Sequence, residues 1–415
     1  MEMNCMKIYL KLSAILFFLL SGVSVSTGSP GISKSKRAYY IKLITNKYPN
    51  QLTNPQKKTR KTFSQFGYGL YEFPVPVFPI SKFIEPGKFG YQSYGKPDRE
   101  TEKNGALYTC SGGFIDVSHM RAAVDWTVYL TFKLIVDTTD FDLPWEAGRL
   151  SLHFKNIGQL TINDIARMAQ KIAFERLVWH EVASWHYHKP YHKFSEQSST
   201  FTPEDTYSNM LGTMIGKNVA LRLLKDTTSR SYSDITTEEI QKTISSLQPL
   251  STKKESKRAY DIVDLDKQRK LPEGQRNTDV WYDSKIVFHD QRYVFKRYMN
   301  IGPEISPWLV PGSEQLGCSS YQAPYTLEVP QFTHDGNSFY KYYEFRITPD
   351  ANMFYNHKKN RQLHPPFGAF TTQHYDKIMA QIDKEMAQVL LPDFDKRDNV
   401  DPTIYYSHVH KVFLK

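Results

Sequence analysis

Three short segments of the chain concentrate side chains that bind metal ions or transfer protons. In the first, Asp116 and His119 lie three residues apart, so a helix would place both on one face. In the second, Glu181 directly follows His180, and Ser184 lies four residues after His180, about one helical turn. The third ends in two consecutive acids. The full candidate set is Asp116, His119, Arg121, His180, Glu181, Ser184, Glu204 and Asp205.

The second segment is close to a zinc-peptidase motif but breaks it. Such peptidases carry two histidines four residues apart on one helix, with a glutamate directly after the first. Here Ser184 stands where the second histidine would be. A zinc site beside His180 would therefore need a nitrogen from elsewhere, either from His119 or from His186.

Carboxylates would complete this predicted site. Glu204 or Asp205, at the start of a later helix, would supply a third ligand, and Asp116 is a further candidate ligand. Glu181 would act as the general base on a water activated by zinc. Arg121 would orient a carboxylate or stabilise negative charge in the transition state. The hypothesis is a metal-dependent hydrolase.

Two other interpretations of the same residues remain open. Ser184 could be a nucleophile with His180 as its base, although the Gly-x-Ser-x-Gly elbow of serine hydrolases is missing. Alternatively, the polar residues form a buried, non-catalytic network that holds helices in register. Arg121 and Asp125, four residues apart, would then be an ordinary intrahelical ion pair. A catalytic site needs a cleft open to solvent, whereas a structural network should be closed.

The surrounding pattern predicts an α+β fold in a single large unit. Apolar spacing and capping residues predict several helices. In the helix that begins at the third segment, Thr202 would be the N-cap and Pro203 the first residue. Helices are expected over 116–136, 161–185, 202–224, 236–247, 252–267 and 374–391, and strands over 150–154, 280–288, 325–329 and 339–347. A helix-rich part (about 114–270) should therefore pack against a mixed α/β part (about 275–400).

The N-terminus reads as a cleavable signal peptide over residues 1–26. Lys7 and Lys11 precede the short apolar run 12–20, and small residues follow at 24–26. The run is too short to span a bilayer, so we expect a periplasmic or secreted protein without a transmembrane segment after cleavage. Residues 27–64 are polar and basic and predict a poorly ordered lead-in before the main domain, 65–400.

The net charge limits the expected binding partners, and the cysteine count limits the expected disulfides. Removing residues 1–26 deletes two lysines and one glutamate, which lowers the net charge from +10 to +9. The excess is spread along the chain without a dense basic run, so nucleic acid is not an expected partner. Export suggests an envelope peptide or polysaccharide instead. Cys110 and Cys318 remain after cleavage, either as a disulfide or as two buried thiols.

The three polar segments resemble a bacterial family of proteins known as domain of unknown function 4056. The similarity lies in four motifs: Gly112–Asp116 with His119 and Arg121; His180–Glu181 with Ser184–Trp185; Phe201–Asp205 with Tyr207–Asn209 and Gly212; and Trp308–Pro311. It extends over roughly residues 65–400. The resemblance implies a bacterial envelope or secreted protein and brings no known activity with it.

Overall fold

The computed structural model describes most of the central part of the chain. The described residues are 31–53, 83–95, 101–185, 200–226, 228–263, 270–275, 301–319, 323–350, 355–356, 361–362, 368–380 and 382. Several predictions lie outside them: the signal peptide, the strand over 280–288, and His186. The helix predicted over 374–391 lies partly outside them.

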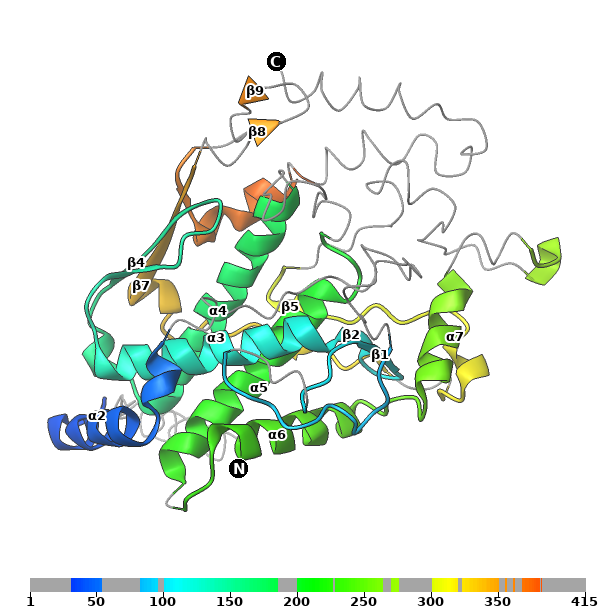
Figure 1. Ribbon diagram of the computed structural model, residues 1–415. Helices are drawn as coiled ribbons and strands as arrows, with labels where there is room; N and C mark the ends of the chain where they lie inside the picture. The colour runs from blue at the N-terminus through cyan, green and yellow to red at the C-terminus, as the bar shows by residue number, and fades with distance from the viewer. Residues whose placement is uncertain are drawn as a thin grey trace, which may run out of the picture.

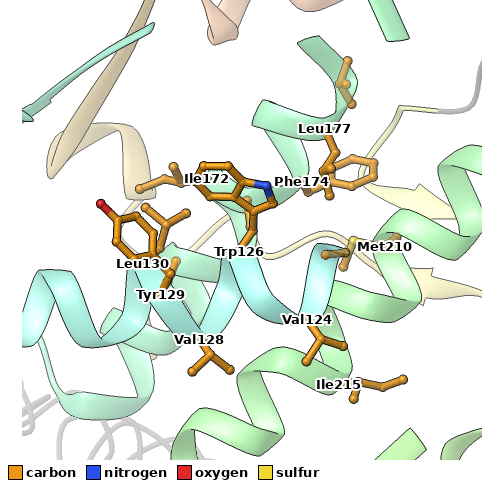
Figure 2. Close-up of a cluster of buried hydrophobic side chains, with 14 of the residues drawn as sticks. Val124, Trp126, Val128, Tyr129, Leu130, Ile172, Phe174, Leu177, Met210 and Ile215 are labelled. Atoms are coloured by element: carbon orange, nitrogen blue, oxygen red, sulfur yellow. The ribbon is translucent and has the colours of Figure 1, made fainter. Parts of the chain in front are cut away.

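Three long helices form the centre of the molecule (Figure 1). They are α3 (Val117–Val136), α4 (Ile162–Trp185) and α5 (Asp205–Lys225). Almost every residue of α3 is buried, because α4 and α5 both pack on it. Its apolar side chains gather around Trp126 together with those of the two neighbouring helices (Figure 2). The helices predicted over 116–136 and 161–185 are confirmed.

Helix α5 approaches α3 unusually closely because glycines face the contact. A Cβ atom at Gly212 would lie 2.1 Å from the carbonyl oxygen of Met120, and one at Gly216 would lie 2.7 Å from that of Val124. No side chain fits at either position, so the two backbones touch directly. This contact fixes the start of α5 beside the start of α3.

A four-stranded antiparallel sheet lies beside the helices, in the order β10-β7-β4-β3. Its strands are Phe370–Thr371, Tyr343–Pro349, Gly148–Phe154 and Phe141–Leu143 in that order. In the central pair, Leu150 lies opposite Ile347, and both side chains are buried. The strand predicted over 150–154 is confirmed. Helices and small antiparallel sheets in one unit confirm the predicted α+β class.

A short hairpin leads into α3. Strand β1 (Ala106–Thr109) pairs with β2 (Gly113–Asp116), and the Asp116 carboxylate caps α3 by accepting the N–H groups of Ser118 and His119. Cys110, at the hairpin turn, forms a disulfide with Cys318, with a Cα–Cα distance of 5.3 Å. Of the two cysteine states left open by the sequence, the chain adopts the disulfide.

The remaining helices lie around this centre. Helix α6 (Tyr232–Ser246) begins four residues earlier than predicted, at a capping box of Ser231 and Asp234. Helix α7 (Lys253–Val263) follows it. The shorter elements are β5 (Glu304–Ile305), β6 (Leu327–Glu328), β8 (Tyr355–Asn356), β9 (Arg361–Gln362), η1 (Pro49–Leu52), η2 (Ile157–Gln159), η4 (Glu273–Gln275), η6 (Ser313–Leu316), η7 (Phe339–Lys341) and η10 (Thr372–His374).

The stretch 27–64, for which the sequence predicts little order, contains a helix in its described part. This helix, α2, spans Lys34–Lys47. Arg37 donates hydrogen bonds to the carbonyls of Leu134 and Ile135 at the end of α3, at 3.0 and 3.1 Å. Arg37 thereby caps the last carbonyls of α3 and holds α2 in place through a tertiary contact. The polar composition of this stretch does not reveal such a contact. Over the described residues, none of the helices has the length and hydrophobicity needed to cross a membrane.

Candidate metal centre

His119, Glu181 and Asp205 come together where the three central helices meet. Each offers one ligand atom, and these three atoms all lie within 4.8 Å of one another. His119 lies near the start of α3, Glu181 in the last turns of α4, and Asp205 at the first position of α5. All three are buried, with exposed fractions of 4%, 4% and 0%.

Both ligand carboxylates are oriented by the backbone of one short turn. The N–H of Phe201 donates to Oε2 of Glu181 at 3.2 Å, and the N–H of Thr202 donates to Oδ2 of Asp205 at 2.8 Å. Among the described residues, the second oxygens, Oε1 of Glu181 and Oδ1 of Asp205, have no hydrogen-bond partner. Each carboxylate is therefore fixed by one oxygen and leaves the other for a ligand, as in metal sites with an ordered outer shell.

The turn itself is conformationally constrained. Phe201 has a φ of 53°, in the left-handed region that bulky residues rarely adopt. The Thr202 hydroxyl donates to Oε1 of Glu204 at 2.7 Å. The N-cap of α5 is Glu204 and the helix begins at Asp205, so the predicted start at Thr202 is wrong. The reason is that Thr202 uses its hydroxyl for the Glu204 side chain, and its backbone N–H for Asp205.

Asp116 borders the same cluster. Its Oδ1 accepts the cap hydrogen bonds at the start of α3, and its Oδ2 lies 3.8 Å from Nδ1 of His119 without a hydrogen-bond partner among the described residues. Its backbone N–H donates to the hydroxyl of Ser208 at 2.9 Å. Nδ1 of His119 and Oδ1 of Asp205 are 3.2 Å apart, in a geometry that makes no hydrogen bond.

Burial and like charges shift the pKa values in this cluster. Burial lowers the pKa of His119, but the charges of Asp205 and Asp116 outweigh it and raise the pKa to about 10. Burial, and then the charge of Asp205, raises the pKa of Glu181 to about 7. The same two causes raise the pKa of Glu204 well above its usual range. Several acids thus compete for few protons, an arrangement that a bound cation would relieve.

His180 points to a different partner. Its Nδ1 lies 2.6 Å from Oε1 of Glu146, whose other oxygen lies 2.6 Å from the guanidinium of Arg176. The indole N–H of Trp179 also donates to the backbone carbonyl of Glu146, at 2.7 Å. Glu146 lies 34 residues before His180 in a loop, and nothing in its sequence context marks it as a partner. His180 is therefore outside the group formed by His119, Glu181 and Asp205.

Arg121 also lies away from that group. The Arg121 guanidinium donates to Asp125 at 3.2 Å and to the carbonyl of Ser93 at 3.0 Å. Arg121 comes two residues after His119, which is about 200° around the helix, so the two side chains point in different directions. Arg121 thus forms the intrahelical pair considered as the structural alternative. Ser184 is 3% exposed in α4, and Nδ1 of His180, its candidate base, is bonded to Glu146.

A family model described as "Protein of unknown function (DUF4056)" matches residues 54–311. The chain belongs to this family. The DUF4056 match includes all three segments that form the cluster and ends at Pro311, so it reaches less far than the resemblance over 65–400 predicted. No curated protein and no solved structure matches the chain.

Proposed function

We propose that this DUF4056 protein binds a divalent metal ion, with zinc as the best candidate, through His119, Glu181 and Asp205. The observation that carries the proposal is the shared geometry of the two carboxylates. Each is anchored by a backbone N–H through one oxygen, while the other oxygen has no hydrogen-bond partner among the described residues, and Oδ1 of Asp205 lies 3.2 Å from Nδ1 of His119. Zinc accepts one imidazole nitrogen and carboxylate oxygens, and catalytic zinc sites use three protein ligands.

The charge balance of the cluster supports a cation. Asp116, Glu181, Glu204 and Asp205 are each at most 4% exposed, and the charges of Asp205, Asp116 and Glu181 act on His119. Buried carboxylates close to one another either take up protons or bind a cation. Protonation is one solution, as the raised pKa values of Glu181 and Glu204 indicate, and a metal ion is the alternative that also uses Oε1 of Glu181 and Oδ1 of Asp205.

We further propose hydrolysis of an envelope peptide or polysaccharide in the periplasm or outside the cell. A divalent ion would polarise a substrate carbonyl and lower the pKa of a water toward neutrality. In this scheme Glu181 is a ligand rather than the general base, and Asp116 is the carboxylate placed to accept a proton. The disulfide is compatible with an extracytoplasmic location, and the predicted signal peptide supports it.

A closed structural network is the second candidate, and the near-complete burial of His119, Glu181 and Asp205 favours it. In that case the cluster holds the ends of α3, α4 and α5 together through protons shared among its acids. The two proposals differ in whether the purified protein takes up a metal ion.

Metal uptake by the wild-type protein and its variants distinguishes a metal site from a structural network. We expect the wild-type protein to bind about one zinc ion per chain, measured by elemental mass spectrometry and by titration against a chromogenic chelator. His119→Ala should lose it, and Glu181→Gln should weaken it by about 10-fold or more. His180→Ala is the matched control, because its Nδ1 is bonded to Glu146, and it should bind normally. No uptake of zinc, manganese or iron by the wild-type protein would leave the structural network.

A further inference from the structure

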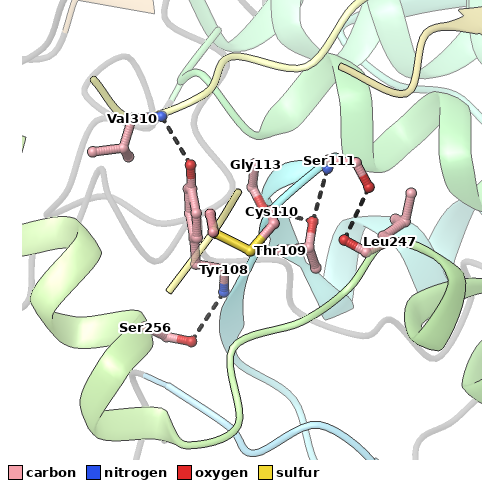
Figure 3. The surroundings of a disulfide bond; sticks show 10 residues. Tyr108, Thr109, Cys110, Ser111, Gly113, Leu247, Ser256 and Val310 are labelled. Atoms are coloured by element: carbon pink, nitrogen blue, oxygen red, sulfur yellow. Dashed lines mark hydrogen bonds between the residues drawn. A yellow bond between two sulfur atoms is a disulfide. The ribbon is translucent and has the colours of Figure 1, made fainter. Parts of the chain in front are cut away.

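The Cys110–Cys318 disulfide fastens a distant segment to the hairpin that precedes α3 (Figure 3). The two cysteines are 208 residues apart in sequence, and both are less than 10% exposed. Beside the bridge, the N–H of Val310 donates to the hydroxyl of Tyr108 at 3.0 Å. The N–H of Tyr325 donates to the carbonyl of Ser111 at 2.7 Å. The described residues of this segment, 308–319 and 323–325, are thus held against the hairpin by one covalent bond and two hydrogen bonds.

The same segment also lies in backbone contact with the hairpin. Gly113 has a φ of 65°, and a Cβ atom there would lie 2.3 Å from the carbonyl oxygen of Trp308. Only glycine allows this combination of left-handed backbone and close approach. Three residues later the strand reaches Asp116, which borders the metal cluster.

Tyr207 connects this segment to α5. Its hydroxyl donates to the carbonyl of Tyr325 at 2.7 Å, and a Cβ at Gly112 would lie 3.3 Å from its ring. It therefore packs between the hairpin turn and the fastened segment. Tyr207 comes two residues after the ligand Asp205, and the next residue, Ser208, accepts the backbone N–H of Asp116. The start of α5 is thereby tied to both ends of the hairpin.

From these contacts we infer that the Cys110–Cys318 disulfide assembles the metal centre, so that the protein binds its metal tightly only after the bridge has closed. The inference rests on the proposed metal site. Closing the bridge converts two thiols into one disulfide, and the two electrons and two protons pass to a disulfide-bearing oxidant by thiol–disulfide exchange. Metal binding would then be restricted to an oxidising compartment, and a reduced precursor would remain metal-free.

The first test compares the oxidised wild-type protein with Cys110→Ser/Cys318→Ser. We expect the variant to remain folded by circular dichroism and to bind zinc at least about 10-fold more weakly, in a titration against a competing chelator. Hydrogen exchange in metal-free protein should also rise in the peptides over 113–119 and 201–208. Equal zinc affinity and equal exchange in the two proteins would overturn the inference and leave the metal site intact. A wild-type protein that binds no metal would overturn both.

A second variant pair keeps the bridge and removes one contact. Tyr207→Phe deletes the hydroxyl that reaches Tyr325, and we expect zinc binding to weaken several-fold. Tyr375→Phe is the matched control, because it also removes a hydrogen bond from a tyrosine hydroxyl to a backbone carbonyl, that of Glu175 at 2.8 Å, and lies outside the contacts between the hairpin and the fastened segment. A lower zinc affinity in Tyr207→Phe alone supports the inference that the fastened segment helps to assemble the metal centre. An equal loss in both variants would show a general effect of stability and contradict it.

Discussion

At the scale of single residues, His119 faces carboxyl groups contributed by three helices. The charges of Asp205, Asp116 and Glu181 all act on its imidazolium, and together they outweigh the cost of its burial. A protonated imidazole cannot bind a metal, because its nitrogens carry hydrogens instead of lone pairs. His119, a ligand in the proposed metal site, thus carries a proton that a bound zinc ion would have to displace. Protons and metal must compete for this site.

This competition predicts proton release on metal binding. At pH 7 His119, with a pKa of about 10, is protonated, and Glu181, with a pKa of about 7, is half protonated. Binding of zinc should therefore release between one and two protons per ion, and the affinity should rise as the pH rises from 6 to 8. Calorimetric titrations in buffers with different ionisation enthalpies measure the number. Release of no proton, or an affinity that does not depend on pH, would contradict the assignment of His119.

At the scale of secondary-structure elements, the sequence predicted the helices well and their meeting point poorly. Apolar periodicity placed α3 correctly because this signal is local, and the structure adds the cap at Asp116. The contact between Glu146 and His180 depends instead on how a loop folds over α4, and no spacing encodes it. Glycines spaced along α5 were the signal for close helix packing. Gly212 and Gly216 face α3, a neighbour that their spacing alone does not identify.

Replacing one of these glycines should damage both the packing and the site. In Gly212→Ala the new methyl group would overlap the carbonyl of Met120, so α5 must move away from α3. We expect a loss of about 2 kcal/mol in the free energy of unfolding, although alanine by itself favours a helix by about 1 kcal/mol. Urea unfolding measures the loss, and weaker zinc binding should accompany it. Gly274→Ala, with no atom of the described residues within 4 Å of the new Cβ, should change neither quantity.

At the scale of the whole molecule, the C-terminal part is integral to the fold although the family match ends before it. Buried Glu175 of α4 accepts hydrogen bonds from the hydroxyls of Tyr340, Tyr343 and Thr372, at 2.8 to 2.9 Å. Strand β7 pairs with β4 along its full length, and its Phe345 and Ile347 are completely buried. The sequence predicted a strand over 339–347, whereas η7 occupies Phe339–Lys341 and the strand spans Tyr343–Pro349. It could not show that a carboxylate in α4 holds the C-terminal part in place.

A chain that ends at residue 311 should therefore fail to fold. Without β7, strand β4 loses its central partner, and Glu175 keeps a buried charge without its tyrosine donors. We expect this truncation to show no cooperative thermal transition, whereas a chain ending at residue 391 should unfold cooperatively like the full-length protein. The shorter chain also lacks Cys318, so full-length Cys110→Ser/Cys318→Ser separates the two causes. If the shorter chain unfolds at the temperature of that double variant, the C-terminal part is an appendage, and the matched region 54–311 is a self-sufficient domain.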